Sequence, residues 1–337
     1  MKKNPKVTVL LPVHNGELFI SEAIESVLNQ TFTDYEFLII DDSSTDNTIK
    51  IIQAKKDDRI KVFCNDKNLG VIGSLNIGLE LARGDYIARM DADDLIRPDR
   101  LKIQVDFMDN NPGTGACGSY YETFGNENTF KVDYLETSNK GIFPQFFLFS
   151  PIPHPGAMIR KAVIDSNNIR YDVKYIHAED YKFWFEIYKC SSLANIPEFL
   201  LFYRISENQI SKKYTKIQSE KSIIIRREIM DYFFSLFQMT FELKSTIEPK
   251  DIVRLKNSFN IIAEKNIDSG VFEKEYLTKI FTNLLYCFYT SVSENPIKTV
   301  IRFAISFDLM RFGLFSDLTR KLIKRCFYVQ EFNYRLI

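Results

Sequence analysis

The sequence has few cysteines, and their spacing forms no recognisable site. Five occur among 337 residues, no two of them in a C-x-x-C pair, at positions 64, 117, 190, 287 and 326. An odd, scattered set provides neither a disulfide framework nor the ligand spacing of a structural zinc site. We therefore expect a protein of a reducing compartment, the cytoplasm.

Long apolar runs and an excess of one charge are also missing. No uncharged apolar run reaches 18 residues, and the basic N-terminus, residues 1–6, leads into a short strand pattern rather than a longer apolar segment. We therefore expect neither a spanning helix nor a signal peptide. Lys and Arg number 44, as do Asp and Glu, so no overall positive field would attract phosphates. This balance argues against a nucleic-acid partner.

What the sequence does contain is an alternation of strands and helices over its first 110 residues. Apolar runs and helical periodicities predict strands at 7–13, 36–40, 60–64 and 85–90. The intervening helices are predicted at about 17–30, after the capping residues 43–46, and around 75–82. Such alternation indicates an α/β fold with a parallel sheet, whose ligands gather at the carboxyl ends of the strands.

Acidic side chains follow two of these strands. Asp41 and Asp42 end the second strand, and Asp91-Ala92-Asp93 follows the fourth. Mg²⁺ accepts one or two protein carboxylates and fills its other positions with water and substrate phosphate, so a D-x-D at a strand end can hold a cation that also binds a diphosphate. The structural alternative is that these aspartates cap turns and helix starts.

The pattern changes after residue 115. Residues 115–124 are strand-like, 151–155 are rich in proline, and 180–188 are helical. After about residue 216 the chain looks helical throughout. A length of 337 residues favours about two domains. We predict an α/β domain over residues 1–215 that carries the ligand site, and an α-helical domain over residues 216–337.

Eight stretches of the sequence resemble the family 2 glycosyltransferases of the GT-A fold. In chain order they are Val7–Asn15, Ala23–Phe32, Glu36–Thr48, Asn68–Asn76, Gly84–Leu101, His154–Lys161, Glu179–Trp184 and Tyr203–Ser211. The resemblance implies a Rossmann-like, mostly parallel sheet flanked by helices, with the helical region following it. It also implies an enzyme that transfers a sugar from a nucleotide diphosphate, most often UDP, with inversion of the anomeric centre.

The resemblance assigns residues to the sugar donor. Asp42, with Asp41 beside it, would accept a hydrogen bond from uracil N3–H, which cytosine cannot donate. The alternative for this pair is a solvated turn that caps the next helix. The full set assigned to the nucleotide sugar is Pro12, Val13, Asn15, Asp41, Asp42, Asn68, Asp91, Ala92, His154 and Arg204.

The same resemblance implies a divalent cation, Mn²⁺ or Mg²⁺. Asp93 would be a direct ligand, Asp91 would lie nearer the ribose or the metal-bound waters, and Asp94 is expected to cap the turn toward Pro98. Many relatives carry a histidine where this chain has Ser206, so whether a histidine completes the metal site is left open. Arg204, permanently charged, is expected to screen the diphosphate.

Asp180 matches the family's general base, and Glu179 would orient it or touch the acceptor. A sugar hydroxyl is too weak an acid to ionise beforehand, so a positioned carboxylate is needed to take its proton. The alternative is that Asp180 only caps the helix that carries Trp184, a residue we expect in the core. His154 would contact acceptor or diphosphate, or else be a hydrogen-bonded structural residue, which is the role we expect for His177.

The C-terminal residues 297–337 form a separate basic segment, with eight Lys or Arg against three acids. Residues 299–313 are apolar nearly all round, which is typical of a buried bundle helix. Contact with a membrane interface, and pairing between copies of the chain, remain open for the same residues.

Together these features predict an inverting, metal-dependent glycosyltransferase of surface polysaccharide or lipopolysaccharide synthesis. Its acceptor would be a glycan or a lipid-linked sugar, and it would add one sugar, since the Q-x-x-R-W motif of processive synthases is missing. It would be cytoplasmic, at the inner face of the membrane if residues 297–337 bind there. The alternatives are a sugar nucleotidyltransferase, although Pro12–Gly16 lacks the basic residues of its phosphate loop, and a non-catalytic binding scaffold.

Overall fold

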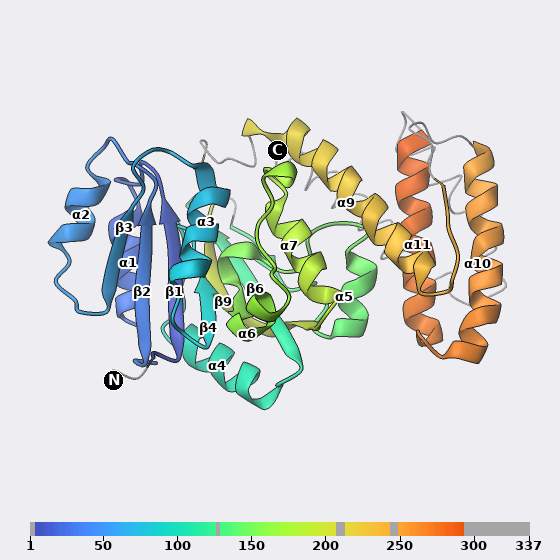
Figure 1. Ribbon diagram of the computed structural model, residues 1–337, viewed down its shortest axis with the longest axis horizontal. Helices are drawn as coiled ribbons and strands as arrows, with labels where there is room; N and C mark the ends of the chain where they lie inside the picture. Colours follow the sequence, from blue (N-terminus) through green and yellow to red (C-terminus); the bar gives the residue numbers. More distant parts are fainter. Residues whose placement is uncertain (1–3, 126–128, 207–212, 243–248, 293–337) are drawn as a thin grey trace. The chain divides into compact units, whose positions relative to one another are not determined.

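The computed structural model describes residues 4–125, 129–206, 213–242 and 249–292 (Figure 1). Its contacts divide the chain into two compact units, one formed by Met1–Ile142 with Ser150–Gln209 and the other by Phe143–Phe149 with Ile210–Ile337. The basic segment 297–337 lies outside the described residues. The domain boundary near residue 215 stays a prediction.

The first unit is built on one mixed sheet in the order β3-β2-β1-β4-β8-β6-β9-β5, with β7 paired to β6. The neighbouring strands β3, β2, β1 and β4 run parallel, as do β6 and β9, while β8 runs antiparallel to both β4 and β6. The strands are β1 (Val7–Val13), β2 (Tyr35–Asp41), β3 (Ile60–Cys64), β4 (Tyr86–Arg89), β5 (Leu95–Ile96), β6 (Thr114–Phe124), β7 (Lys131–Val132), β8 (Met158–Arg160) and β9 (Ser192–Arg204).

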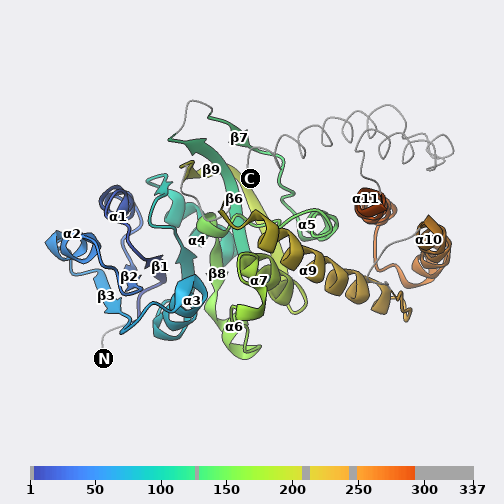
Figure 2. The same cartoon turned by 90° about the horizontal axis from the view of Figure 1, so that it is seen from above.

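Helices cover both faces of the parallel part of the sheet. Figure 2 shows α1 on one side of strands β1 to β3 and α3 on the other. The helices of this unit are α1 (Ile20–Leu28), α2 (Thr48–Ala54), α3 (Gly70–Leu81), α4 (Arg100–Asn110), α5 (Asn139–Gln145, whose last residues belong to the second unit), α6 (Lys161–Ser166) and α7 (Glu179–Tyr188), with 3-10 turns η1 (His154–Gly156) and η2 (Val173–Tyr175).

The core explains why the first strands lack the alternation of a half-exposed strand. Every residue of β1 and of β2 is buried, because helices shield both faces of these strands. The helix predicted at about 17–30 is shorter in the structure, and it buries Ile20, Ala23, Ile24 and Val27 against the sheet. Each such aliphatic side chain contributes about 1.5–3 kcal/mol when fully buried.

Strand β9 was not predicted, and its sequence shows why. Its pairing with β6 shifts register between Ile196 and Phe199, so Pro197 and Glu198 lie in a bulge. Proline cannot donate to a strand ladder and a bulge breaks the apolar alternation, so the thirteen-residue strand is not evident from periodicity. The predicted strand at 115–124 is confirmed as β6.

The second unit is helical where it is described, which confirms the expected C-terminal helices. It contains α9 (Thr215–Ser235), α10 (Pro249–Ser269) and α11 (Lys274–Val292). Leu277, Ile280, Leu284 and Leu285 are buried on one face of α11. Between α10 and α11, the rings of Phe259 and Phe281 stack with centroids 4.0 Å apart. None of the described helices combines the length and apolar character needed to cross a membrane.

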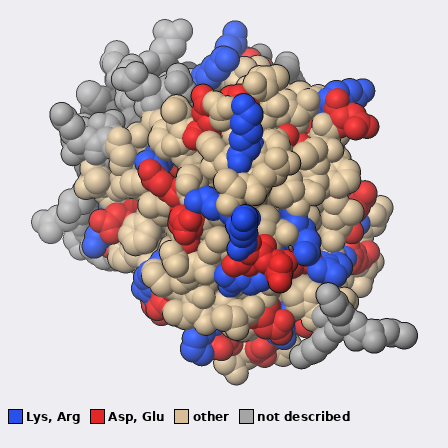
Figure 3. All heavy atoms as spheres, turned by 90° about the vertical axis from the view of Figure 1, so that its left-hand side faces the viewer, with Lys and Arg blue, Asp and Glu red and all other residues tan. Residues whose placement is uncertain are grey.

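The charged side chains of the first unit are mixed in sign on the face that Figure 3 shows, where Lys and Arg stand among Asp and Glu. Several of them form ion pairs, such as Lys55 with Glu25 at 2.7 Å between α2 and α1. Exposed pairs of this kind contribute about 0–1 kcal/mol each. This face therefore carries no excess of one charge, in agreement with the equal numbers of basic and acidic residues in the whole chain.

Candidate active site

The site begins where strands β2, β1 and β4 end at the same edge of the sheet. Because the three strands are parallel neighbours, the loops that follow them meet. Gly16, after β1, has no room for a side chain: a Cβ there would lie 2.6 Å from Val13 Cγ2 and 3.8 Å from the Cβ of Ala92, after β4. The D-x-D segment thus packs against the first loop.

Asp42 lies in a buried polar cluster after β2. Its Oδ1 accepts hydrogen bonds from Asn65 Nδ2 at 2.7 Å and from the main-chain N–H of Leu69 at 2.8 Å. Asp41 and Asp42 are only 2% and 3% exposed, so they do not form a solvated turn. Capping of α2 falls instead to Asp46, whose Oδ1 accepts from the N–H of Thr48 at 3.0 Å.

Asn15 joins the loops after β1 and β2. Its φ of 52° lies in the left-handed region, which asparagine tolerates better than most residues. Its N–H donates to Ser44 Oγ at 2.9 Å, and its Oδ1 accepts from the N–H of Thr45 at 2.8 Å. The other residues assigned to the donor lie around the same edge: Pro12 and Val13 are buried at the end of β1, and Asn68 Oδ1 accepts from the N–H of Gly70 at 3.0 Å.

Three carboxylates gather after β4. One oxygen each from Asp91, Asp93 and Asp94 lies within 4.8 Å of the others. Burial, followed by the charge of Asp91, raises the pKa of Asp93 to about 6. Burial and the charges of Asp91 and Asp93 raise the pKa of Asp94 well above its usual range. The three groups repel one another when ionised, so a divalent cation between them would be strongly favoured.

The sequence led us to expect that Asp94 caps the turn toward Pro98, and the structure shows that this expectation is wrong. Its Oδ1 accepts from the main-chain N–H of Arg204 at 2.8 Å, while its Oδ2 is buried without a hydrogen-bond partner. The sequence D-A-D-D at residues 91–94 could have indicated that a third carboxylate belongs to the cluster. The structure places Asp94 in the acidic cluster.

Arg204 packs beside the same cluster. Its Nε donates to the carbonyl oxygen of Asp93 at 2.7 Å, and its Nη2 pairs with Glu22 Oε2 at 2.6 Å. The guanidinium carbon lies 4.4 Å from the ring centroid of Phe19 and 4.3 Å from that of Phe124. These contacts fix the main chain at Asp93. The expected contact of Arg204 with the diphosphate stays a prediction.

Glu179 and Asp180 open helix α7. Asp180 Oδ2 accepts from Ser150 Oγ at 3.0 Å, while Glu179 Oε2 is buried without a hydrogen-bond partner. Burial raises the pKa of Asp180 against the opposing hydrogen bond from Ser150. Burial and the charge of Asp180 raise the pKa of Glu179 to about 7. The N-cap residue of α7, Ala178, has no capping side chain, and the Asp180 carboxylate accepts from main-chain N–H groups of the first turn, so the alternative of a capping role for Asp180 stays open.

An aromatic cluster packs beside this pair. Tyr171 stacks on Phe183 with centroids 4.1 Å apart, and His154 Nε2 lies 2.9 Å from the hydroxyl oxygen of Tyr171. Trp184 is fully buried with its ring edge-on to His154, which confirms the expected core position. Burial, followed by the charge of Arg89, lowers the pKa of His154 well below its usual range, so this imidazole is neutral.

Comparison with known proteins identifies the family. The model of glycosyl transferase family 2 matches residues 8–168. A Haemophilus influenzae protein described as an uncharacterized glycosyltransferase is 32% identical, and the match covers 99% of each chain. The chain belongs to glycosyl transferase family 2.

This family 2 glycosyltransferase has a more distant relative in Escherichia coli. That protein is the UDP-Glc:alpha-D-GlcNAc-diphosphoundecaprenol beta-1,3-glucosyltransferase WfgD, which is 29% identical over 65% of this chain and 85% of its own length. Membership of the family makes the chain an enzyme that transfers sugars. The alternatives of a sugar nucleotidyltransferase and of a silent scaffold are therefore set aside.

Solved structures share the fold of this glycosyltransferase. TarS 1-349 of S. aureus, in complex with UDP-GlcNAc, has a TM-score of 0.55 at 19% identity, covering 88% of this chain and 83% of its own. The mannosyltransferase PcManGT of Pyrobaculum calidifontis, in complex with GDP-Man and Mn²⁺, has a TM-score of 0.52 at 15% identity, covering 97% and 85%. The expected GT-A fold is confirmed.

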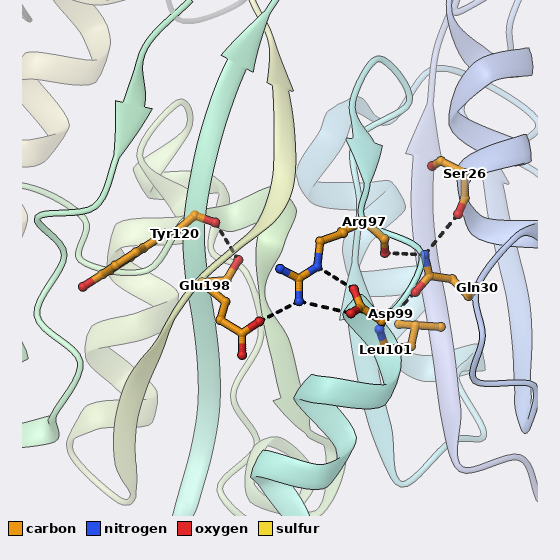
Figure 4. A network of polar contacts seen from close by, with 8 residues as sticks. Ser26, Gln30, Arg97, Asp99, Leu101, Tyr120 and Glu198 are labelled. Carbon is orange, nitrogen blue, oxygen red and sulfur yellow. Dashed lines mark hydrogen bonds and ion pairs between the residues drawn. The ribbon is translucent and has the colours of Figure 1, made fainter.

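A polar network surrounds the segment between β5 and α4, which follows the acidic cluster in the chain (Figure 4). Arg97 pairs with Asp99 at 2.5 Å and with Glu198 of the β9 bulge at 2.6 Å. The Gln30 amide donates to the carbonyl oxygen of Arg97 at 2.8 Å and accepts from the N–H of Leu101 at 3.0 Å. The segment that follows β5 is thereby tied to Gln30, just after α1, and to β9.

Sequence reasoning missed Arg89, the last residue of β4. Its Nη2 pairs with Asp91 Oδ1 at 2.5 Å. Its charge also acts on Glu179 and Asp180, lowering their pKa values against the larger effect of burial. The signal was a charged residue inside an otherwise apolar strand pattern, two positions before the D-x-D.

Proposed function

We propose that this glycosyltransferase moves one sugar, with inversion, from a UDP-sugar to a glycan or lipid-linked acceptor in surface polysaccharide or lipopolysaccharide synthesis. The observation that carries the proposal is the presence of two acidic groups, each at least partly buried, in one unit. One is the Asp91, Asp93 and Asp94 cluster, and the other is Glu179 with Asp180. The charge of Arg89 acts on both groups.

Asp42 supports recognition of uracil. Its Oδ1 accepts from two N–H donors that fix the orientation of the carboxylate, and the group can accept a further hydrogen bond from the imide N3–H. A UDP donor also agrees with UDP-GlcNAc in the TarS complex and with the UDP-Glc in the printed name of WfgD. Asn15 and Asn68 would complete the walls around base and ribose.

A divalent cation fits the acidic cluster. The three carboxylates of this cluster, one of them with a buried oxygen that has no hydrogen-bond partner, form the hard oxygen set that Mn²⁺ and Mg²⁺ accept. The Mn²⁺ in the PcManGT complex agrees with this assignment. When bound, the cation would neutralise charge on the departing diphosphate. Asp93 and Asp91 would hold it, with Arg204 fixing the main chain at Asp93.

Asp180 would act as the general base. The acceptor oxygen forms a bond to the anomeric carbon as the bond to the diphosphate oxygen breaks, and that electron pair leaves with UDP. The acceptor hydroxyl proton passes to Asp180, whose raised pKa suits it better to take a proton than that of an exposed aspartate. Glu179, with its pKa raised to about 7, would orient the acceptor through its unpaired oxygen.

The acceptor side supports a sugar bound near His154. The Nε2 atom of the neutral imidazole is engaged with the Tyr171 hydroxyl, which leaves Nδ1 to interact with a sugar hydroxyl, and Tyr171 and Trp184 contact the ring. A lipid-linked acceptor agrees with the diphosphoundecaprenol in the name of WfgD. Residues 297–337 would then hold the enzyme at the membrane, which flotation with anionic liposomes tests. We also propose residues 1–215 as the catalytic domain.

Replacing Asp180 with Asn tests the proposal. We expect UDP affinity to be retained while transfer falls by about 10²–10⁴-fold. The matched control is Asp106→Asn, an exposed carboxylate on α4 paired with Lys102, which should leave both quantities unchanged. Undiminished transfer in the Asp180 variant would remove that residue from the role. A screen of UDP-, GDP- and dTDP-sugars for donor hydrolysis identifies the nucleotide.

A further inference from the structure

Arg89 is a charged side chain in a place where charge is rare. It ends β4, in register with Leu10 of the neighbouring strand β1, and its side chain is 5% exposed. Its main-chain N–H donates to the carbonyl oxygen of Ala157 at 2.9 Å, so the backbone here is fixed on both sides. A buried arginine is retained only where its charge or its donors are used.

The guanidinium of Arg89 has more N–H donors than the surrounding protein has acceptors for them. Nη2 pairs with Asp91 Oδ1 at 2.5 Å, while Nε and Nη1 are buried without hydrogen-bond partners. Arg160, at the opposite end of β4, differs from it. The guanidinium of Arg160 donates to the carbonyl oxygens of Thr114, Met108 and Asn111, which is how an arginine stabilises chain ends. Arg89 instead devotes its one printed side-chain bond to a carboxylate of the acidic cluster.

Asp91 needs such a partner. Its side chain is 31% exposed, whereas Asp94 is buried, so Asp91 has room to rotate toward solvent. Repulsion from Asp93 and Asp94, within 4.8 Å, favours that rotation. A guanidinium held rigidly by its strand opposes it, because charge-assisted bonds of this kind are short and directional.

We propose that Arg89 is a positioning residue of the donor site: by pairing with Asp91 it holds that carboxylate within the acidic cluster, where a divalent cation and the nucleotide diphosphate bind. The inference rests on the proposed function, which places cation and donor at this cluster. Arg89 touches neither ligand and acts through Asp91. Partners that orient metal ligands in this way typically change metal affinity about 10–100-fold when removed.

Charge alone would have the opposite effect. Removing a positive group beside a cation site strengthens cation binding, while releasing Asp91 weakens it. The direction of the change therefore separates a positioning role from simple charge balance. It also separates both from a purely structural role, which would lower thermal stability and leave the affinity of the folded protein unchanged.

The experiment uses the full chain with Arg89→Met, Arg89→Lys and the structural control Arg160→Met. Binding of Mn²⁺ in the presence of UDP is read from the loss of the free-ion signal in electron paramagnetic resonance. We expect Arg89→Met to raise the Mn²⁺ dissociation constant about 10–100-fold. Arg89→Lys should fall between it and the original chain, since lysine keeps the charge without the planar fork. Arg160→Met should lower the melting temperature and leave the constant within about twofold.

A double-mutant cycle with Asp91→Asn gives the decisive comparison. If Arg89 acts through Asp91, adding Arg89→Met to Asp91→Asn changes the constant less than about twofold. Full additivity, or unchanged or tighter Mn²⁺ binding by Arg89→Met alone, would overturn the inference. If the original chain binds no Mn²⁺, the metal site of the proposed function fails instead. The same double-mutant cycle, measured as the dissociation constant of UDP, then tests the positioning role of Arg89. An unchanged UDP dissociation constant in Arg89→Met would overturn the inference.

Discussion

The two sides of the candidate site are constructed differently. On the donor side, parallel strands β2, β1 and β4 end at one edge, so Asp42 and the acidic cluster are brought together by topology. On the proposed acceptor side, residues 150–188 form short helices, 3-10 turns and one three-residue strand. There the functional groups are held by side chains, through the Tyr171–Phe183 stack and the Ser150–Asp180 hydrogen bond.

This difference indicates how each side can change. A regular sheet keeps its edge when a loop residue is replaced, so replacing a donor-side group that would contact the ligand should alter binding with little effect on folding. An acceptor side held by packed rings has no such independent frame, so a substitution there should alter stability and activity together. The predictions that follow test this contrast.

The largest expected effect is on the donor side, from Asp93→Asn. We expect transfer to fall by about 10²–10³-fold, since the variant removes a ligand of the cation that would stabilise the leaving group. The melting temperature in chelator should not fall, because the change relieves repulsion from Asp91. Assays of transfer and Mn²⁺ binding check this. Asp85→Asn, at the opposite end of β4, is the control, and full activity with Asn at position 93 would contradict the metal assignment.

The next largest effect is on the acceptor side, from Trp184→Ala. The fully buried indole packs against His154 and Phe183, so its removal should lower the free energy of unfolding by about 3–5 kcal/mol. Acceptor KM should rise as well, because His154 loses a neighbour. Urea denaturation and kinetics with the acceptor measure the two effects.

A core substitution on the donor side gives the comparison for Trp184→Ala. Ile24→Ala, on the buried face of α1, should cost about 2–5 kcal/mol while leaving acceptor KM unchanged. If the tryptophan variant also leaves acceptor KM unchanged, the proposed difference between the two sides is wrong.

Glu179 gives the acceptor side a pH dependence. Burial and the charge of Asp180 raise its pKa to about 7 from a usual value of 4.5. The folded state therefore holds more protons than the unfolded state between these values, and stability falls as pH rises through this window. Glu179→Gln, neutral at every pH, should match the original chain at about pH 4 and be more stable at about pH 8. Chemical denaturation at both pH values checks this, and an equal stability at pH 8 would refute it.

The same contrast explains what the sequence could predict. Strands β2 and β4 and the positions of Asp42 and Asp93 follow from buried, mostly apolar runs that lead into acids, a local signal. Asp180 was found through the resemblance to the family and by no periodicity, because its environment is made by residues distant in the chain. Asp94 was interpreted as a turn cap, since only the pairing of β5 with β9 brings the N–H of Arg204 to it.

Arg89 shows a further limit. A charged residue at the end of an apolar strand can be buried and functional, or it can mark the point where the strand leaves the core. The sequence alone does not show that a further strand covers Arg89. Strand β8, which pairs with β4 through Ala88 and Met158, supplies that cover. Burial of the guanidinium, and hence its value as a fixed charge, depends on this tertiary pairing.

The smallest expected effect is on the donor side, from Asp46→Ala. Asp46 Oδ1 accepts from the N–H of Thr48 at the start of α2, and its Oδ2 accepts from the N–H of Glu17 at 3.1 Å. Loss of this cap should cost about 1 kcal/mol of stability. UDP affinity should fall less than about twofold, because parallel β1 and β2 fix the strand ends without the cap. Isothermal titration with UDP measures this, and Lys50→Ala on the same helix is the control. A tenfold loss of UDP affinity would show that the loops, and not the strand ends, position the donor.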